Sequence, residues 1–273
     1  RSETLFDDAF ALLDELENQL SLYRPESDLS RLNRTGALDS AGRHLLAVLG
    51  ESARMSRATQ GAFDVTIQPL WRAYADQPTL PTAELLAAAR AKVDYRRVQV
   101  TGRSVRLAPG AEVTLNGIAQ GYALDRVREL LRSRGVINAL IDTGELGALG
   151  VKDGSPWRTG IQHPVVEDAL AAVTPMDHRC IATSGDYATT FTADRRLHHL
   201  LDPRTGVSPP ELSSVTVVAP TGVLADALST AVFVLGPERG LKLVSATPDA
   251  DAMLIAKQDA KVWTTAGFPR ANS

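Results

Sequence analysis

The part of the chain that most constrains the fold is residues 224–232, which read LADALSTAV. Nearly every position in this stretch is apolar or small, so apolar side chains surround the predicted helix on almost all sides. A helix of this kind is typical of a protein interior. The sequence therefore predicts a buried helix from about residue 223 to 235, closed by Gly236 and Pro237.

One carboxylate interrupts this apolar helix. Asp226 lies three residues before Ser229 and four before Thr230, so their side-chain oxygens project from one helix face. A buried carboxylate is costly unless it is ion-paired, hydrogen-bonded or bound to a metal. Oxygen donors suit Mg²⁺ or Ca²⁺ better than zinc, so the spacing indicates a candidate metal site. The simpler alternative is that Asp226 caps a helix or pairs with an arginine.

Outward from this helix, the chain alternates between helical and strand patterns. Apolar residues recur every three or four positions in predicted helices at 5–20, 42–59 and 85–93, and in one that contains Tyr122 and ends at Gly135. Residues 98–107 alternate around a turn, which predicts a hairpin. Further short strands are predicted at 112–115, 136–141, 157–161, 180–183, 196–201, 213–218, 253–255 and 261–264. Because no internal repeat or linker is visible, we expect one α+β domain over residues 1–273, with largely antiparallel sheets flanked by helices.

The composition argues against several classes of function. The 273 residues include 29 Lys and Arg against 32 Asp and Glu, a net charge of −3, which argues against a nucleic-acid or anionic-membrane surface. No run of about 18 apolar residues is present, so a membrane-spanning chain is not expected. Cys180 is the only cysteine, which excludes an internal disulfide. Aromatic residues make up 5% of the chain, so we expect a core built mainly of Ala, Val and Leu.

Three further polar segments are candidates for a site. Residues 116–121, NGIAQG, follow a predicted strand and precede a helix, so their backbone either holds a phosphate group or simply forms a tight turn. Residues 198–206, HHLLDPRTG, place two histidines before a turn, and on a strand at most one of the two faces a site. A solvated histidine pair is the simpler alternative. The segment TSGD at 183–186 fits either a pocket loop or an ordinary turn.

Together these segments resemble the ApbE family of FAD:protein FMN transferases. The resemblance extends over residues 20–243 and rests on six ordered blocks with similar spacing. The blocks are YRPESDLSRLN (23–33), TQGAFD (59–64), NGIAQGY (116–122), ATSGDY (182–187), HLLDPRTG (199–206) and ADALSTA (225–231). The resemblance implies a Mg²⁺-dependent enzyme of the ApbE fold. Such an enzyme moves the FMN half of FAD onto a Ser or Thr hydroxyl of an acceptor flavoprotein, through a phosphodiester bond, and releases AMP.

The resemblance also implies roles for individual residues. Asp226 and Thr230, with Ser229 near them, match the family's side-chain metal ligands, and the Gly117 carbonyl matches a main-chain ligand. His199 matches the histidine of the family's His-x-x-Asp-Pro block. His199 and Asp226 are therefore the expected catalytic residues, with His199 in the substrate pocket and in proton transfer. Contacts with the flavin nucleotide are implied for Tyr23, Ala62, Phe63, Asp64, Thr114, Gln120 and Leu200.

Some features depart from the usual family pattern. Gln120 stands where that pattern has lysine, so we expect a phosphate-facing positive charge to be missing. The variant NGIAQG resembles the branch linked to nitrous-oxide reductase maturation, which implies a membrane-bound flavoprotein of that system as the acceptor. The family usually begins with a strand and a Met-Gly-Thr-like segment, whereas this sequence begins almost at its first helix. The resemblance also implies a periplasmic, exported protein, although no signal peptide is visible.

Two alternatives to transfer are compatible with the same residues. Mg²⁺-dependent hydrolysis of FAD to FMN and AMP would use the whole site, with water in place of the acceptor hydroxyl. A flavin-binding maturation factor without turnover is the second alternative, suggested by Gln120 and by the short N-terminus.

Overall fold

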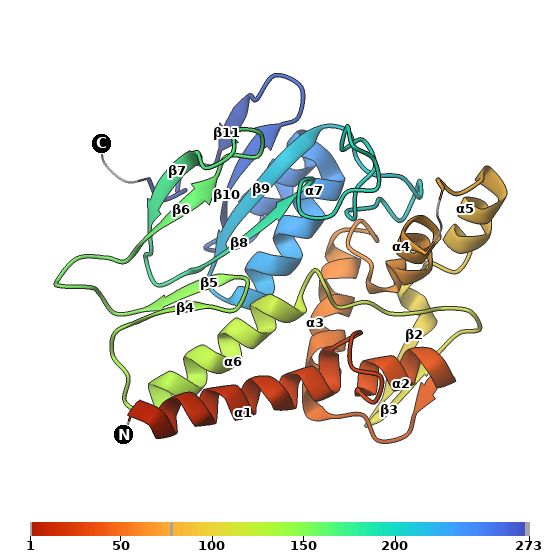
Figure 1. The fold of residues 1–273 in the computed structure, drawn as a ribbon, viewed down its shortest axis with the longest axis horizontal. Coiled ribbons are helices and arrows are strands. Elements are labelled where there is room, and N and C mark those ends of the chain that lie inside the picture. Colours follow the sequence, from red (N-terminus) through yellow and green to blue (C-terminus); the bar gives the residue numbers. More distant parts are fainter. Residues whose placement is uncertain (1, 77–78, 271–273) are drawn as a thin grey trace.

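The computed structural model describes residues 2–76 and 79–270, and Figure 1 shows the arrangement of its helices and sheets. The α-helices are α1 (Ser2–Leu20), α2 (Asp28–Thr35), α3 (Arg43–Ala58), α4 (Gln68–Ala75), α5 (Ala83–Arg90), α6 (Ala119–Ser133) and α7 (Gly222–Ser245), and the 3-10 helices are η1 (Val65–Ile67) and η2 (Tyr95–Arg97). The strands are β1 (Ala37–Leu38), β2 (Val98–Thr101), β3 (Ser104–Leu107), β4 (Ala139–Asp142), β5 (Leu146–Leu149), β6 (Arg158–Gln162), β7 (Leu170–Pro175), β8 (Cys180–Gly185), β9 (Leu212–Ala219), β10 (Asp251–Ala256) and β11 (Val262–Thr264).

A six-stranded sheet forms the centre of the structure, in the order β11-β10-β9-β8-β5-β4, and all of its neighbouring strands are antiparallel. All eight residues of β9 are buried, because both faces of the sheet are covered. Val215 and Val217 belong to the core on the α7 side, while Val218 belongs to a second cluster that includes Ile161 of β6. This period of two is what a strand buried on both faces requires.

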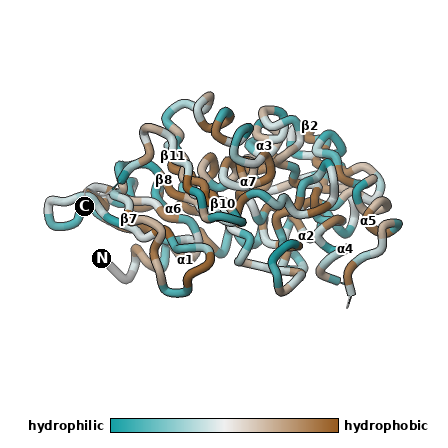
Figure 2. Tube along the Cα trace, turned by 90° about the horizontal axis from the view of Figure 1, so that it is seen from above, coloured by the Kyte–Doolittle hydropathy of each residue, from teal (hydrophilic) through white to brown (hydrophobic). Residues whose placement is uncertain are grey.

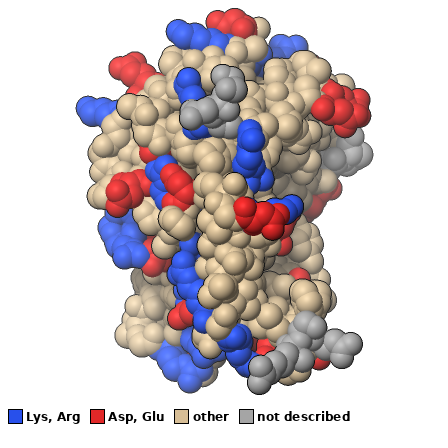
Figure 3. Space-filling model, turned by 90° about the vertical axis from the view of Figure 1, so that its left-hand side faces the viewer, with Lys and Arg blue, Asp and Glu red and all other residues tan. Residues whose placement is uncertain are grey.

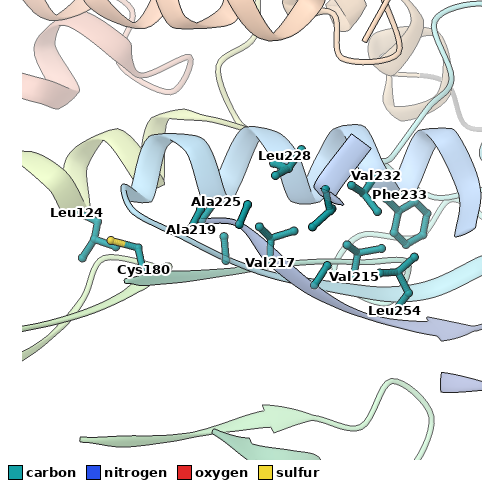
Figure 4. Close-up of a cluster of buried hydrophobic side chains, with 14 of the residues drawn as sticks. Leu124, Cys180, Val215, Val217, Ala219, Ala225, Leu228, Val232, Phe233 and Leu254 are labelled. Atoms are coloured by element: carbon teal, nitrogen blue, oxygen red, sulfur yellow. The ribbon is translucent and has the colours of Figure 1, made fainter. Parts of the chain in front are cut away.

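Helix α7 packs across the sheet and is itself enclosed. Ala225 and Phe233 point toward Val217 and Val215 of β9 (Figure 4). On the other side of α7, Ala227 belongs to a separate core shared with α1, α2 and α3. Figure 2 shows hydrophobic segments concentrated around α7 and hydrophilic segments mainly in peripheral loops. The burial predicted for this helix is therefore confirmed.

Helices α6 and α7 approach so closely that backbone contacts backbone. A Cβ atom on Gly121 would lie 2.1 Å from the Gly222 carbonyl oxygen, and one on Gly222 would lie 2.4 Å from the Gly121 carbonyl oxygen. The Asp125 carboxylate accepts hydrogen bonds from the N–H groups of Gly222 and Val223, at 2.7 and 2.9 Å. These bonds satisfy free donors in the first turn of α7 and hold it against α6. The Asp226 end of α7 therefore lies next to the turn that begins α6.

The predicted α+β class with antiparallel sheets is confirmed, and so is the predicted end of the buried helix at Gly236, whereas the helical segment that follows was not predicted. Helix α7 (Gly222–Ser245) consists of two helical segments that meet at a kink, where the backbone of Gly236 is not helical. Gly236 adopts a φ of 76°, which bends the chain, and Pro237 then starts the second half of the helix. Proline is favoured in a first turn because its missing N–H is not needed there.

Two predicted strands are wrong. Residues 112–115 form no strand, because the backbone of Val113 bonds to the Asn33 side chain: its N–H donates to Oδ1 at 2.7 Å and its carbonyl accepts from Nδ2 at 2.8 Å. Val113 and Leu115 are still buried, so the apolar alternation reflects packing without strand pairing. Residues 196–201 form a loop whose pairing is one isolated bridge, between Thr190 and His198. The short helices α2 and α4 were not predicted.

The surface shows no single dominant sign of charge on the face drawn in Figure 3, where acidic and basic side chains are interspersed. Of the helices in the described ranges, none has the combination of length and apolar content that a bilayer crossing requires.

Candidate active site

The residues predicted to bind metal come together where α7 passes the start of α6. The Gly121 N–H donates to Oδ2 of Asp226 at 2.9 Å, although the two residues are 105 positions apart in sequence. Thr230 follows one helical turn later and lies beside Gly117. A Cβ atom on Gly117 would be 2.9 Å from Oγ1 of Thr230. Contact between the turn at 116–121 and α7 therefore gathers a carboxylate, a hydroxyl and a backbone segment at one point.

Two buried serines add hydroxyls to this group. Ser229 Oγ donates to the Asp226 carbonyl at 2.9 Å, so its proton is used within α7. Ser184 Oγ, from β8, lies 2.8 Å from Ser229 Oγ and 3.3 Å from Thr230 Oγ1. Because Ser229 donates to the backbone, Ser184 donates and Ser229 accepts between the two hydroxyls. The segment 183–186, which the sequence left open between a pocket loop and a turn, thus carries a side chain beside the candidate site.

Glu145 is a second buried carboxylate near Asp226 and was not among the predicted site residues. It directly precedes β5, is 9% exposed, and its Oε2 accepts a hydrogen bond from the Thr183 N–H at 3.3 Å. An acidic residue immediately before an apolar strand was the one signal in the sequence. Its proximity to α7 depends on the pairing of β5 with β8, which the local sequence does not specify.

This pair of carboxylates is unfavourable when both are ionised. Burial raises the pKa of Asp226 and of Glu145, and the charge of Asp226 raises the pKa of Glu145 further. No Arg or Lys in the described ranges lowers either pKa, so the alternative of an arginine partner for Asp226 is not supported there. A bound divalent cation would remove the penalty.

The chemistry of the donors fits a hard cation. The described part of the chain has no group of three or more His, Cys, Asp or Glu that could hold a metal. Remaining ligands would therefore come from the Thr230 hydroxyl, the Gly117 carbonyl and water. Carboxylate, hydroxyl and carbonyl oxygens together are typical of Mg²⁺ or Ca²⁺ sites, whereas zinc sites usually include His or Cys ligands.

His199 lines a cavity of about 580 Å³, together with Tyr23, Asn116 and Gln120. The Thr189 carbonyl lies 3.0 Å from the His199 backbone N–H and 3.1 Å from its Nδ1. A carbonyl oxygen can only accept, so Nδ1 carries the ring proton and Nε2 keeps a free lone pair in the neutral form. Burial lowers the pKa of His199 below its ordinary value of 6.5. The side chain can therefore accept a proton near neutral pH.

A second cavity of about 400 Å³ adjoins this one, and Tyr23 and Asn116 line both. The Tyr23 side chain is 81% exposed, so it contributes little to the protein core and presents its ring to any ligand that spans the two cavities. Trp71 and Arg34 line the second cavity. A larger cavity of about 900 Å³ lies between α3, α6 and α7 and is lined by none of the predicted site residues.

Several of the predicted nucleotide contacts are used inside the protein. Asp64 Oδ1 accepts hydrogen bonds from the Thr66 N–H at 2.8 Å and hydroxyl at 2.6 Å, and Oδ2 accepts from the Tyr95 N–H at 2.8 Å. Ala62 and Phe63 are buried, and the Phe63 ring lies close behind Gly117. Phe63 therefore packs against the turn at 116–121, and Asp64 holds the neighbouring segments 64–66 and 94–95 together.

The side chains of Thr114 and Leu200 also make contacts within the protein. Thr114 Oγ1 accepts a hydrogen bond from the Asn116 N–H at 3.3 Å, which shapes the same turn. The Leu200 side chain belongs to the core on the α7 side of the sheet. A nucleotide contact of Leu200 would therefore involve its backbone.

His198 is fully buried, so the histidine pair is not solvated as the simpler alternative supposed. Its ring packs edge-on against Phe233 at 5.5 Å, and neither ring nitrogen has a hydrogen-bond partner among the described residues. Burial and then the charge of Lys257 lower the pKa of His198 to about 4.

The free energy of unfolding should therefore depend on pH through His198. Its pKa is about 4 in the folded state and close to 6.5 in the unfolded state, so the unfolded chain binds the proton first as the pH falls between these values. This preferential protonation of the unfolded chain lowers the free energy of unfolding by about 3 kcal/mol as the pH falls over that range. His198→Leu should abolish this loss and leave stability at neutral pH unchanged or higher by about 1 kcal/mol, because no buried nitrogen is left unpaired. Urea unfolding at several pH values across this range measures the effect. The control His178→Asn changes an exposed histidine and should behave as the wild type. A pH dependence of stability in His198→Leu equal to that of the wild type would contradict the prediction.

Comparison with known proteins identifies the family. A sequence model of the ApbE family matches residues 2–254. The chain belongs to the ApbE family. A protein named FAD:protein FMN transferase from Vibrio cholerae serotype O1 is 33% identical, over 98% of this chain and 84% of its own length. The solved structure of the flavin transferase ApbE from Vibrio cholerae superposes with a TM-score of 0.87 at 31% identity, covering 98% of this chain and 90% of that one. The apo flavinyl transferase ApbE of Pseudomonas stutzeri superposes with a TM-score of 0.85 at 35% identity, covering 97% and 86%.

In this ApbE chain, Gln120 lies at the cavity beside the turn between β4 and β5. Its Nε2 would be 2.0 Å from a Cβ atom on Gly144, and its backbone carbonyl accepts from Oγ1 of Thr143 at 3.2 Å. Among the described residues that line the 580 Å³ cavity there is no Lys or Arg. The positive charge for a phosphate in this cavity would therefore come from outside its lining, either from a bound cation or from Arg34 and Arg72 of the second cavity.

Proposed function

We propose that this chain is a Mg²⁺-dependent FAD:protein FMN transferase that acts as a single domain of 273 residues. It would move FMN from FAD to a Ser or Thr hydroxyl of an acceptor protein, form a phosphodiester bond and release AMP. The names of its relatives support the activity. The observation that carries the proposal is the double role of the turn at 116–121. Its Asn116 and Gln120 line the His199 cavity, while its glycines contact Asp226 and Thr230.

Asp226, Thr230 and the Gly117 carbonyl would hold the Mg²⁺, with Ser229 close by. When bound, the ion supplies positive charge that offsets the FAD diphosphate and the charge that develops on the departing AMP. Burial of the Asp226 carboxylate strengthens this electrostatic effect, since little water screens it.

His199 would act as the base for the acceptor hydroxyl. Nε2 accepts the hydroxyl proton, the hydroxyl oxygen forms a bond to the FMN phosphorus, and the bond from that phosphorus to the AMP oxygen breaks. The hydrogen bond from Nδ1 to the Thr189 carbonyl keeps the ring in the tautomer that this step needs. Tyr23, at the junction of the two cavities, would hold the ring system of the nucleotide.

The rate of FMN transfer should therefore show an acid limb controlled by His199. Burial lowers the pKa of His199 below 6.5, so the rate should rise with pH through a midpoint below 6.5 and then level off. His199→Gln should lower kcat about a hundredfold or more and abolish the limb, because general-base catalysis contributes roughly a hundred- to ten-thousandfold. Initial rates at saturating FAD, Mg²⁺ and acceptor measure this profile. A midpoint above 6.5, or an acid limb that persists in the variant, would show that another group controls it.

Product analysis separates transfer from its alternatives. The chain is incubated with FAD, Mg²⁺ and an acceptor domain that carries a Ser or Thr flavinylation motif, and the products are separated by chromatography and mass spectrometry. Transfer predicts covalent FMN on the acceptor and an equal amount of AMP, both lost when the acceptor hydroxyl is replaced by Ala or when EDTA is added. Free FMN and AMP without acceptor labelling would indicate FAD hydrolysis. Bound FAD without AMP would indicate a maturation factor without turnover.

The acceptor is proposed to be a membrane-bound flavoprotein of nitrous-oxide reduction, and the chain is proposed to work in the periplasm. The acceptor is inferred from the resemblance of NGIAQG at 116–121 to one branch of the family, and the periplasmic location from the usual location of family members. A competition assay with the soluble domains of several acceptors tests the first proposal: preferential labelling of the nitrous-oxide system's flavoprotein is expected, and equal or lower labelling would reject it. Fractionation of cells that express the natural gene tests the second.

A further inference from the structure

Asp186 is a completely buried carboxylate that neither the metal site nor the cavity uses. It directly follows β8, and its exposed fraction is 0%. Its N–H donates to the Ser213 carbonyl at 3.0 Å, and its Oδ1 accepts from the Ser213 hydroxyl at 2.9 Å. Asp186 is thus joined twice to the start of β9.

Two cations from different segments neutralise this carboxylate. The Lys257 Nζ, just after β10, lies 3.0 Å from Oδ2, and the Arg195 Nη1 lies 3.4 Å from Oδ1. Both cationic side chains are largely buried, with 17% and 29% of their surface exposed. An ionised carboxylate is stable in the interior only with such partners.

The same cations tie the surrounding loops to one another. Lys257 Nζ also donates to the Arg195 carbonyl, and Arg195 Nη1 donates to the Pro164 carbonyl at 2.7 Å. Asp186 is therefore the centre of a cluster that connects the ends of β8 and β10 with the loop between β6 and β7 and with residues 186–199.

His199 lies at the far end of this loop, where the loop closes on itself. The Thr189 carbonyl holds both the backbone N–H and Nδ1 of His199, and the Phe191 N–H donates to the Leu197 carbonyl at 2.8 Å. Arg195 lies within the segment that both of these pairs close. A shift of Arg195 would therefore move Thr189 and the imidazole that Thr189 orients.

We propose that Asp186 is a positioning residue for His199: its buried ionic cluster with Lys257 and Arg195 fixes the loop 186–199 and so the orientation of the imidazole in the cavity. The proposal rests on the proposed function for its kinetic consequences, but not for its structural ones. Asp186 does not line the cavity, so it has no direct role toward FAD.

The negative charge of Asp186 also raises the pKa of His199, against the larger lowering by burial. The other titratable groups around His199 come from every side of the cavity and are Glu17, Tyr23, Asp142 and the neighbouring His198. None of them changes in the variants below, so a shift in the titration of His199 reports on Asp186.

The test compares Asp186→Asn with Asp251→Asn. Asp251, at the other end of β10, forms a similarly buried ion pair with Arg179 at 2.7 Å and does not contact the loop 186–199 in the described structure. It is therefore a matched control for the loss of a buried ion pair. Ring resonances of ¹³C-labelled histidine are followed against pH without FAD or Mg²⁺, and the His199 signal is assigned with His199→Gln.

In Asp186→Asn we expect a lower pKa for His199 than in the wild type and a broadened or doubled ring signal. The kcat of transfer should fall about ten- to a hundredfold, while the KM for FAD changes by less than about twofold, because misplacement of a catalytic group affects turnover more than binding. Asp251→Asn should lose thermal stability but keep the wild-type kcat and His199 titration. A wild-type His199 titration and kcat in a folded Asp186→Asn protein, or equal effects of the two variants, would overturn the proposal.

If Asp186→Asn does not fold, Lys257 offers a second test. Lys257→Met removes the donor to the Arg195 carbonyl but leaves Asp186 paired with Arg195, and it should lower kcat about tenfold. Lys257→Arg keeps the charge and a donor, and should restore most of the activity. Equal kcat values for Lys257→Met and Lys257→Arg would also overturn the proposal. Absence of transfer in the wild type, with the expected NMR changes present, would reject the proposed function and leave the positioning of His199 intact.

Discussion

Asp226→Asn is expected to lower kcat about a thousandfold, the largest catalytic effect predicted for this protein, while the chain stays folded. A metal ion that stabilises transition-state charge contributes several kcal/mol, and about 4 kcal/mol corresponds to this factor. Asparagine keeps an oxygen to accept from the Gly121 N–H but loses the charge that attracts Mg²⁺. Burial raises the pKa of Asp226, so the ionised carboxylate is costly without a cation, and the metal-free stability should not fall.

Three measurements check this prediction together. Calorimetric titration reports Mg²⁺ binding, AMP release reports turnover, and thermal unfolding in EDTA reports the fold. Thr230→Val and Thr230→Ser form a matched pair: the valine variant removes a hydroxyl that would bind the ion, and the serine variant keeps it. If Asp226→Asn bound Mg²⁺ with wild-type affinity, or if both Thr230 variants lost the same amount of Mg²⁺ affinity, the cation would bind elsewhere.

Gly121→Ala is expected to cause the largest loss of stability, about 3 kcal/mol or more. The new Cβ would lie 2.1 Å from the Gly222 carbonyl oxygen and 2.7 Å from Cβ of Asp226, and both are parts of the helix α7 that cannot move independently. The helices α6 and α7 would have to separate, which would also break the Gly121–Asp226 hydrogen bond. Mg²⁺ affinity should therefore fall together with stability.

Gly50→Ala is the control for this substitution. Gly50 lies inside α3 with no atom within 4 Å of its potential Cβ, so alanine there should stabilise the protein by about 0.5–1 kcal/mol. Urea unfolding gives both free energies. A Gly121→Ala protein as stable as the wild type would mean that the close approach of the two helices is not needed.

Local sequence patterns were sufficient for several features of the site. The apolar surroundings of α7 follow from its composition, and the common face of Asp226, Ser229 and Thr230 follows from helical geometry alone. The family followed from six blocks in order, and the α+β class with antiparallel sheets followed from alternating patterns and turns. The strand expected at 112–115 failed because its alternation records the burial of Val113 and Leu115, while the Asn33 side chain takes the place of a neighbouring strand.

Other features depend on contacts between distant segments. Glu145 reaches the Asp226 region because β5 pairs with β8, and Ser184 because β8 lies under α7; neither pairing leaves a mark on the local sequence. The separation of the two adjacent histidines, with His198 in the core and His199 at the cavity, follows from the loop 186–199 and not from a strand.

The sequence by itself determined the family, the composition of the core helix and the identity of the main candidate ligands, because these depend on residue type and on spacing within one helix or one motif. Tertiary structure alone decided which carboxylates meet, which histidine nitrogen is free and which buried charges hold the loop. Those properties arise from burial and from distances between residues such as Gly121 and Asp226, 105 positions apart, which no local periodicity encodes.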